Sequence, residues 1–371
     1  MYKKALILGT NATQTDFINY LKEIGWEVHA CGHKKVGPGC ESAHYFHLVD
    51  TIDIEAVKKL ANDIDADIVY SVSSDSAIRT ATNISSELGL PTLLNTEIVE
   101  LFHRKDQFRK FLNEKNISTV KFLKVKNSDQ AMEWDTYPCV VKPTDSQGQR
   151  GVSLVNDKKE LLKEISKALD NSTSNTAIVE EYLDGVEFSS NIIIQNGKIV
   201  VNEFTDRLTF GPTYFGLPKG HAIPANSITD KQYQLAVNDI SKLVSVLELT
   251  DAVLYIQMKL YKGEPRIVEV APRLDGCHIW RLIKHHKGYD LREYILKCLI
   301  GEDIDHREST VNDNQRSILK FHHLKTGLEF IRDNFLLNRE VVFNQFRYQD
   351  HEKVVPINGK LEVVGYYIYD E

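Results

Sequence analysis

The sequence predicts an α/β protein that begins with a parallel sheet covered by helices and ends in a region rich in β-strands. Over residues 5–91, short apolar runs alternate with amphipathic stretches. Two later segments read as hairpins, and strand-like runs dominate the last 60 or so residues. Strands that alternate with helices are typical of a parallel sheet with both faces covered. The first part of the chain is therefore expected to be a Rossmann-like domain.

The first domain is predicted from periodicity and turn residues. Strands are expected at 5–9, 26–31, 45–49 and 68–72, and helices at 15–24, 54–62 and 76–88. The first turn, 9–13, lacks the G-x-G-x-x-G pattern, so dinucleotide binding is disfavoured. Polar residues near the strand ends either border a substrate pocket or only form turns and helix caps. These residues are Thr10, Asn11, Ser73, Ser74 and Asp75.

Elements further along the chain follow from the same patterns. A charged amphipathic helical region spans 96–115, and strands alternate with helices over 117–180. A hairpin over 188–204 turns at Asn196-Gly197, a dipeptide typical of a type I′ turn. The stretch 206–226 reads as a long irregular loop, in which His221 is expected to be structural. Helices at 229–247 and 289–300 and strands at 317–322, 341–343 and 363–368 complete the prediction.

Composition limits the classes of function. The chain has 371 residues, of which 42% are hydrophobic and 26% charged, as in a globular protein of several domains. A net charge of -7 gives no sign of nucleic acid or anionic membrane as a partner. No apolar run approaches the length of a membrane span. The five cysteines are widely spaced with no C-x-x-C pair, so reduced thiols and a cytoplasmic location are expected.

The segment YPCVVKPTDSQGQRG, residues 137–151, is the main candidate for binding phosphate. An apolar strand delivers Lys142, and a loop with Gly148 and Gly151 follows. Glycine lets backbone N–H groups approach phosphate oxygens, and the lysine supplies positive charge. Residues 145–149, among them Ser146, have nothing apolar to bury, so this loop is expected to be mobile.

Two further motifs follow in a fixed order. IVEEYLDGVEF, residues 178–188, carries two acids seven residues apart, Glu180 and Glu187. A hairpin turning at Lys262-Gly263 brings Gln257 and Glu269 onto facing strands and ends in E-x-x-P-R at Arg273. A lysine with a glycine loop, an acidic hinge and such a hairpin, in this order, resemble the ATP-grasp superfamily. The resemblance covers residues 1 to 300 and is greatest to its carboxylate–amine ligases, including biotin-carboxylase-like and L-amino-acid-ligase-like members.

The resemblance implies a division of the chain. A Rossmann-like domain over 1–95 is followed by a two-lobed ATP-grasp fold and a small β-rich C-terminal domain. In this scheme 96–175 forms the small lobe with its linker, 176–305 the large lobe and 306–371 the C-terminal domain.

The resemblance also implies an ATP site. Lysines and the glycine loop hold the triphosphate, the two hinge acids bind the adenine or the ribose, and main-chain groups between them contact the base. These roles fall on Lys105, Lys142, Ser146, Gly148, Gly151, Glu180, Glu181, Leu183 and Glu187.

The metal site implied by the resemblance departs from the pattern of the family. Family members carry an acid where this chain has Gln257 and an Asn where it has Ala271, whereas Glu269 is retained. A neutral amide can ligate Mg²⁺ but cancels no charge. One Mg²⁺ is therefore expected through Glu269 with Gln257, a second would be held more weakly, and Mn²⁺ is an alternative ion. Arg273 is expected to act in catalysis with Lys142 by stabilising the transferred phosphoryl group. Asp275, Gly276 and His278 are expected at the substrate end.

The function implied is an ADP-forming ligase. A small-molecule carboxylate takes the γ-phosphate to form an acyl phosphate, and an amine displaces phosphate to form an amide. Two alternatives stay open: an ATP-dependent carboxylase or nucleotide-pathway ligase, and an ATP-binding protein that has lost catalysis, which Gln257 and Ala271 motivate. A homodimer is expected from the resemblance alone.

Overall fold

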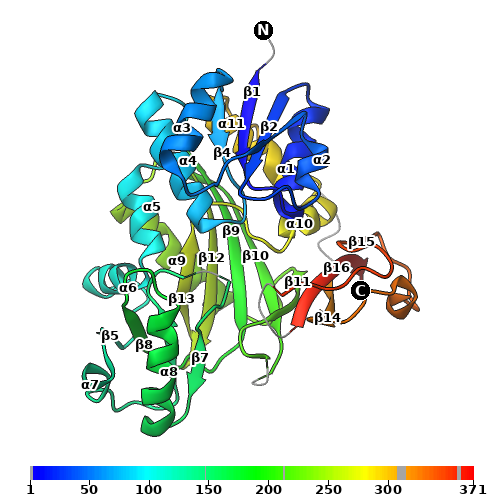
Figure 1. Ribbon diagram of the computed structural model, residues 1–371. Coiled ribbons are helices and arrows are strands. Elements are labelled where there is room, and N and C mark those ends of the chain that lie inside the picture. Colours follow the sequence, from blue (N-terminus) through cyan, green and yellow to red (C-terminus); the bar gives the residue numbers. More distant parts are fainter. Residues whose placement is uncertain (1–2, 147, 212–213, 307–314, 357–360) are drawn as a thin grey trace.

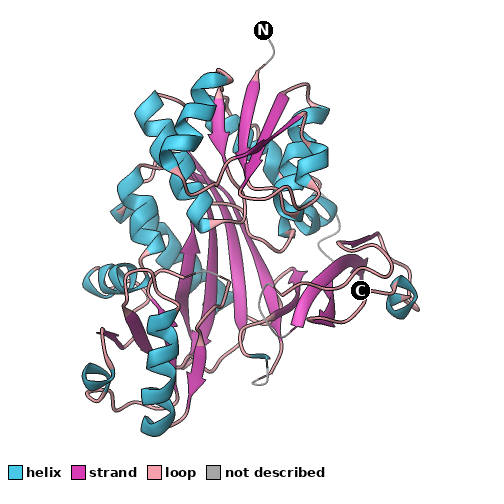
Figure 2. Cartoon of the chain, in the orientation of Figure 1, coloured by secondary structure: helices cyan, strands magenta, loops and turns pink. Residues whose placement is uncertain are grey.

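The computed structural model describes residues 3–146, 148–211, 214–306, 315–356 and 361–371. It contains a parallel sheet at the N-terminal end, a long antiparallel sheet through the middle and a small antiparallel sheet beside it (Figures 1 and 2). The predicted mixed α/β class, with a Rossmann-like first domain and a two-lobed second part, is confirmed.

The N-terminal sheet has the strand order β3-β2-β1-β4 with every described pairing parallel. Two of its helices, α1 and α4, begin at residues named as possible caps: Asn11 forms a capping box with Gln14, and the Ser74 side chain accepts from Ala77 N. The elements are β1 (Lys4–Leu8), α1 (Ala12–Glu23), β2 (Glu27–Gly32), α2 (Gly39–Ser42), β3 (Tyr45–Leu48), α3 (Ile54–Asp63), β4 (Ile68–Tyr70) and α4 (Asp75–Leu88).

The small lobe is an antiparallel sheet of order β5-β8-β6-β7, backed by α8. The predicted helical region over 96–115 consists of two helices, because the backbone at Arg104 is extended (φ -89, ψ 95). The elements are α5 (Thr96–His103), α6 (Lys105–Glu114), β5 (Phe122–Val125), α7 (Ser128–Ala131), β6 (Cys139–Pro143), β7 (Ser153–Val155), α8 (Lys158–Asp170) and β8 (Ala177–Glu181).

The long sheet has the order β13-β12-β9-β10-β11-β14-β16-β15. Both predicted hairpins are confirmed, with positive φ at Asn196, Gly197, Lys262 and Gly263. The elements are β9 (Glu187–Gln195), β10 (Lys198–Thr209), β11 (Pro218–Ile223), α9 (Asp230–Val246), β12 (Ala252–Tyr261), β13 (Glu264–Ala271), α10 (Ile279–Lys287), α11 (Leu291–Ile300), β14 (Ser317–Lys325), the 3₁₀ helix η2 (Arg332–Phe335), β15 (Phe343–Phe346) and β16 (Leu361–Asp370).

The expectation of an irregular loop over 206–226 was wrong in part. β10 continues to Thr209, and β11 forms at 218–223 because it pairs with β14, far along the chain. Local patterns carry no information on so distant a partner. The same pairing makes β14, β16 and β15 continue the long sheet (Figure 1). The domain boundary at residue 306 stays a prediction.

Two cores position the long sheet. One face, including Ile193, Val201 and Val253, packs with α10, α11 and the N-terminal domain. The other face, including Ile192 and Ile194, packs against α9 and α6. Of the helices in the described residues, none is long and apolar enough to cross a membrane. All five cysteines are unbridged.

Candidate active site

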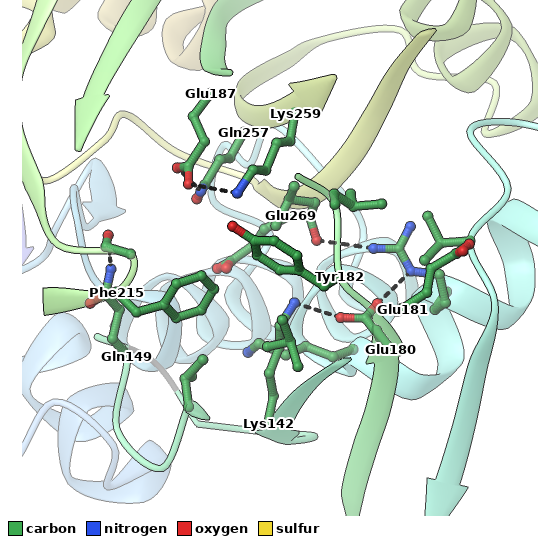
Figure 3. A pocket seen from close by; sticks show the side chains of 18 of the residues that line it. Lys142, Gln149, Glu180, Glu181, Tyr182, Glu187, Phe215, Gln257, Lys259 and Glu269 are labelled. Carbon is green, nitrogen blue, oxygen red and sulfur yellow. Dashed lines mark hydrogen bonds and ion pairs between the residues drawn. The ribbon is translucent and has the colours of Figure 1, made fainter. Parts of the chain in front are cut away.

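A cavity of about 130 Å³, partly open to solvent, lies between the small lobe and the long sheet (Figure 3). Every residue predicted to bind ATP or the metal lines it except Gly151, and Arg273, predicted to act in catalysis, does not line it. Its lining consists of Lys105, Arg109, Val120, Val140, Lys142, Ser146, Gly148, Gln149, Val152, Glu180, Glu181, Tyr182, Leu183, Glu187, Phe215, Gly216, Gln257, Lys259, Val268 and Glu269.

One wall carries a buried group of three charges. Glu180 Oε2 lies 2.5 Å from Lys142 Nζ, and Glu180 Oε1 accepts from Arg109 Nε at 2.7 Å. Burial alone would raise the pKa of Glu180, but the charges of Lys142 and Arg109 lower this pKa to about 2. Two cations share one carboxylate, so this wall keeps an excess positive charge that suits an anionic ligand.

The loop predicted to bind phosphate is attached at both ends. Lys105 Nζ donates to Ser146 O at 2.6 Å, and the Asp145 carboxylate accepts from Ser172 Oγ, Thr173 Oγ1 and Ser174 N. Burial opposes ionisation of Asp145, but these hydrogen bonds lower its pKa. At the far end Gln149 Nε2 donates to Gly216 O. Gln147, part of the loop expected to be mobile, lies outside the described residues.

The hinge between the lobes forms an apolar slot. Val120, Val140 and Leu183 line it, and the Tyr182 and Phe215 rings stand with centroids 6.0 Å apart. Leu183 is 8% exposed, and its N–H has no backbone partner among the described residues. A main-chain N–H without a backbone partner, on a residue that lines a cavity, can donate to a ligand acceptor. The slot and this donor fit a purine base.

Glu187 joins three donors at the opposite wall. Its Oε2 accepts from Arg207 Nη1 at 2.8 Å and from Gln257 Nε2 at 3.2 Å. Lys259 Nζ lies 3.4 Å from Glu187 Oε1 and 4.8 Å from the Tyr182 ring centroid. Glu187 is thus the shared acceptor of a polar row on β9, β10 and β12, of which Figure 3 shows Glu187, Gln257 and Lys259.

Gln257 and Glu269 are direct partners in the pairing of β12 with β13, as the sequence predicts. Because Gln257 Nε2 donates to Glu187, the amide oxygen is the group left for a cation. Among the described residues no group of three or more His, Cys, Asp or Glu side chains could hold a metal by itself. One amide oxygen and one carboxylate fit Mg²⁺, which binds few protein ligands and takes the rest from phosphate and water.

Two predicted residues lie off the cavity. Arg273 donates from Nε to Asp75 Oδ1 at 2.7 Å and from Nη1 to Leu274 O. Gly151, at φ +70, faces Asn171 and Pro143 so closely that a Cβ would stand 2.9 Å from each. The absence of a side chain at Gly151 lets the end of the loop pack closely on the small lobe, against Pro143 and Asn171.

The sequence reasoning missed Arg109, Lys259, Gln149 and Phe215. Two of them carry a usable signal. Arg109 is four residues after Lys105 on one helix, so both share a face. Lys259 is two residues after Gln257 on one strand, so both side chains point to the same face of the sheet. The other two depend on the contact between two loops, which no spacing indicates.

The substrate-end candidates meet at a boundary between domains. Ser73 N donates to Leu274 O at 3.3 Å, and a Cβ on Gly276 would meet only Ser73. Asp275 is buried, and burial raises its pKa to about 6. His221 is also buried, and burial lowers its pKa well below the ordinary value. The strand ends of the N-terminal sheet therefore face the loop that follows β13.

Comparison with known proteins agrees with this geometry. Residues 135–280 match the family model described as ATP-grasp domain. A formate-dependent phosphoribosylglycinamide formyltransferase of Prochlorococcus marinus is 29% identical over 226 residues, which are 59% of this chain and 54% of that protein. The chain thus spans about half the length of this curated relative.

Solved structures share the fold over the whole chain. An L-amino acid ligase from Bacillus licheniformis has a TM-score of 0.82 at 18% identity, covering 100% of this chain and 93% of that one. The biotin carboxylase domain dimer of Hydrogenobacter thermophilus 2-oxoglutarate carboxylase, in complex with MgADP, ADP and bicarbonate, has a TM-score of 0.79 at 14% identity, with coverages of 99% and 86%. At these identities the likeness shows the fold alone.

Proposed function

We propose that the protein is an ADP-forming carboxylate–amine ligase, on the premise that residues 135–280 match the family model described as ATP-grasp domain. It joins a small-molecule carboxylate to an amine through an acyl phosphate. The proposed partners are these small molecules, with no nucleic acid and no membrane, and a homodimer is proposed from the resemblance.

One observation carries the proposal. A single cavity brings together a cationic wall at Lys142, an apolar hinge at Leu183 and the oxygen pair of Gln257 and Glu269. A nucleoside triphosphate has a base, a charged phosphate chain and a need for a divalent cation, and each wall matches one of these parts.

Each residue has a role that its position supports. Lys142 and Lys105, with the loop at Ser146 and Gly148, hold and orient the phosphates. Glu181 and Leu183 offer main-chain contacts to the base, while Glu180 keeps the Lys142 ammonium in place. Gln257 and Glu269 would hold Mg²⁺, or Mn²⁺ in its place, and a bound ion would neutralise phosphate charge. Gly151 packs against Pro143 and Asn171 and so holds the end of the loop on the small lobe.

Arg273 is proposed to stabilise charge on the transferred phosphoryl group. In the structure its guanidinium is bonded to Asp75, which begins α4 of the N-terminal domain. For this role the guanidinium has to exchange Asp75 for a phosphoryl oxygen. We expect this exchange to accompany substrate binding, because the phosphoryl oxygens offer the same bidentate geometry as the carboxylate.

The experiment that tests the function traps the acyl phosphate. Pools of carboxylates are incubated with Mg·ATP and hydroxylamine, and hydroxamate and ADP are measured in the wild type, Lys142→Ala, Arg273→Ala and the control Arg266→Ala. Removal of one charge-stabilising donor is expected to lower kcat by roughly 100-fold or more in Arg273→Ala. Arg266 pairs with exposed Glu264, so its variant is expected to keep full activity.

The outcomes separate the candidates. Carboxylate-dependent hydroxamate and ADP support the ligase. ADP release that needs bicarbonate and no other carboxylate would assign a carboxylase instead. Tight ATP binding without ADP release in any pool would favour the ATP-binding protein that has lost catalysis.

A further inference from the structure

We propose that His103 is a catalytic residue that takes a proton from the attacking amine, whose nitrogen enters a small cavity beside Lys105 and Glu269. The substrate class that follows is a basic amine, one that is protonated at neutral pH. The assignment rests on the proposed function, because the amine attacks an acyl phosphate.

A second cavity, of about 10 Å³, adjoins the candidate active site. Lys105, Ser146 and Glu269 line both cavities, so these residues form the boundary between the two. The volume of the second cavity holds about one water molecule, and an amino group has a similar size. The rest of its lining consists of Asp75, Val99, Phe102, His103, Val270 and Pro272.

The break between α5 and α6 brings His103 to this cavity. His103 is the last residue of α5 and Lys105 the first of α6, while Arg104 between them is extended. Alternate residues of an extended segment point to the same side, whereas residues two apart in an unbroken helix do not face each other. The break therefore lets His103 and Lys105 line one cavity.

His103 is available to accept a proton. It is half-buried, and no hydrogen bond joins its ring to another residue in the part of the chain that the structure describes. Burial lowers the pKa of His103, and the positive charges of Arg79 and Lys105 act in the same direction. The negative charges of Glu100 and Asp75 oppose this effect and do not reverse it. The imidazole is therefore neutral at pH 7, and one ring nitrogen offers a lone pair.

The second cavity lies at the phosphoryl end of the proposed ATP site. Lys105 and Glu269 on its boundary are the proposed ligands of phosphate and Mg²⁺. Asp75 of α4 lines the cavity and accepts from Arg273 Nε at 2.7 Å, so Arg273 is connected to the same place. Glu269 also faces the cavity, and among the described residues no hydrogen bond or ion pair joins it to His103. An amine beside His103 is therefore next to the proposed position of the acyl phosphate.

The proton balance of the reaction requires such an acceptor. A basic amine arrives as R–NH₃⁺, whose nitrogen has no electron pair for attack until one proton leaves. The His103 lone pair takes that proton, and the freed electron pair forms the C–N bond at the carbonyl carbon. The C–O bond to phosphate breaks with its electrons on phosphate, which takes the second proton from the nitrogen. The products are an amide, HPO₄²⁻ and a protonated His103, which then releases its proton to water.

The test compares nucleophiles that differ in protonation. A simple amine has a pKa close to that of lysine, about 10.4, so at about pH 7.4 roughly one molecule in a thousand is unprotonated. Hydroxylamine is unprotonated at this pH and has no first proton to lose. The full chain is incubated with Mg·ATP, the carboxylate that gives most hydroxamate, and either hydroxylamine, methylamine or ammonium chloride. Hydroxamate and amides are measured by mass spectrometry.

We expect His103→Gln to lower amide formation from methylamine and ammonium by about 100-fold or more, the usual effect of losing a positioned proton acceptor. Hydroxamate formation is expected to stay within about twofold of the wild type, which also shows that the variant folds and makes the acyl phosphate. His103→Asn covers the case in which the glutamine variant does not fold, and the same selective loss is expected.

His323→Gln is the matched control. His323 of β14 is also half-buried, burial likewise lowers its pKa, to about 4, and it lines neither cavity. This variant is expected to form hydroxamate and amides like the wild type. Equal selective loss in His103→Gln and His323→Gln would overturn the inference.

The pH dependence separates proton transfer from a structural role. Because the pKa of His103 is lowered from 6.5, amide formation by the wild type is expected to stay nearly constant between pH 7 and pH 9. In His103→Gln the rate depends on unprotonated amine from solution and should rise about tenfold per pH unit over this range. Parallel profiles of the two proteins would overturn the inference.

The outcomes distinguish the inference from the proposed function. If the wild type forms no hydroxamate from any carboxylate, the proposed function fails and the role of His103 fails with it. The proposed function stands and the inference alone fails in two cases. In one, the wild type forms hydroxamate but no amide from methylamine or ammonium. In the other, both His103 variants lose hydroxamate and amide formation equally or lose neither.

Discussion

Lys142 Nζ lies 2.5 Å from Glu180 Oε2 in the wall of the cavity. The two residues come from neighbouring strands, β6 and β8, and stand diagonally across the ladder, since Lys142 pairs with Ile178 and Glu180 with Val140. Arg109 completes the group from α6. The lysine predicted to bind phosphate and the acid predicted at the hinge thus contact each other directly, so the proposed nucleotide binding and the stability of the lobe would depend on one charge group.

Glu180→Gln should reveal this coupling in the pH dependence of stability. The folded pKa of Glu180 is about 2, below its ordinary value of 4.5, so the carboxylate stabilises the fold above pH 4.5 and loses this effect as pH falls toward 2. At pH 7 the wild type is expected to exceed the variant by about 3 kcal/mol in the free energy of unfolding, and this excess should fall by about half by pH 3. Urea denaturation at each pH gives the difference.

Glu264→Gln serves as the control, since Glu264 forms an exposed pair with Arg266 and little pH-dependent stability is expected from it. A difference between the wild type and Glu180→Gln that stays constant from pH 7 to pH 3 would contradict the buried pair.

Lys142→Met should weaken nucleotide binding. Loss of the ammonium removes the proposed phosphate contact and leaves Glu180 with Arg109 alone. The dissociation constant of a non-hydrolysable ATP analogue is expected to rise about tenfold or more. Lys121→Met, in the same lobe but on the surface, is expected to bind like the wild type. Equal affinities in the two variants, measured by calorimetry, would remove Lys142 from the phosphate site.

Local patterns were enough to predict most of the strands and both hairpins, and the resemblance supplied the residues that were correctly expected in the cavity. Gln257 and Glu269 could be placed opposite each other because a two-residue hairpin fixes the register. Glycine turns and apolar alternation act over a few residues, and the ATP-grasp motifs supplied the order of the lobes. The helix α10 was missed, because its polar residues and its start at His278, with positive φ, hide the boundary.

Contacts between distant segments could not be predicted. Arg273 belongs to a recognisable motif, but its partner Asp75 lies 198 residues earlier in the sequence. Gly151 has the composition expected of a phosphate loop, yet its neighbours Pro143 and Asn171 make it a packing residue. A sequence motif shows which residues occur at which spacing. The roles of Arg273 and Gly151 depend instead on which distant elements the fold brings next to them.

Gln257→Glu should raise the affinity for magnesium. A carboxylate at this position faces Glu269 and adds one negative charge to the proposed ligand pair. The apparent dissociation constant for Mg²⁺, measured on the nucleotide-bound protein, is expected to fall by about tenfold. The new acid also lies beside Glu187, so without Mg²⁺ the variant should unfold at a lower temperature than the wild type.

Gln345→Glu is the matched control, because Gln345 is exposed on β15 and should change neither quantity. The dissociation constant for Mg²⁺ is measured by titration with the nucleotide analogue present. If it is the same in Gln257→Glu and in the wild type, the metal binds elsewhere.

Gly151→Ala should destabilise the small lobe and displace Lys142 together. A residue with a Cβ at φ +70 is strained by roughly 1–2 kcal/mol, and here the Cβ would also press on Pro143 and Asn171 at 2.9 Å. Gly263→Ala carries the same kind of strain at φ +80 with nothing within 4 Å, so the excess in Gly151→Ala measures the clash. Because Pro143 directly follows Lys142, relief of the clash moves the phosphate-binding lysine. We therefore expect faster hydrogen exchange in β6 and β7 and weaker binding of the ATP analogue in Gly151→Ala only, and equal behaviour of the two variants would show that the contact is not needed.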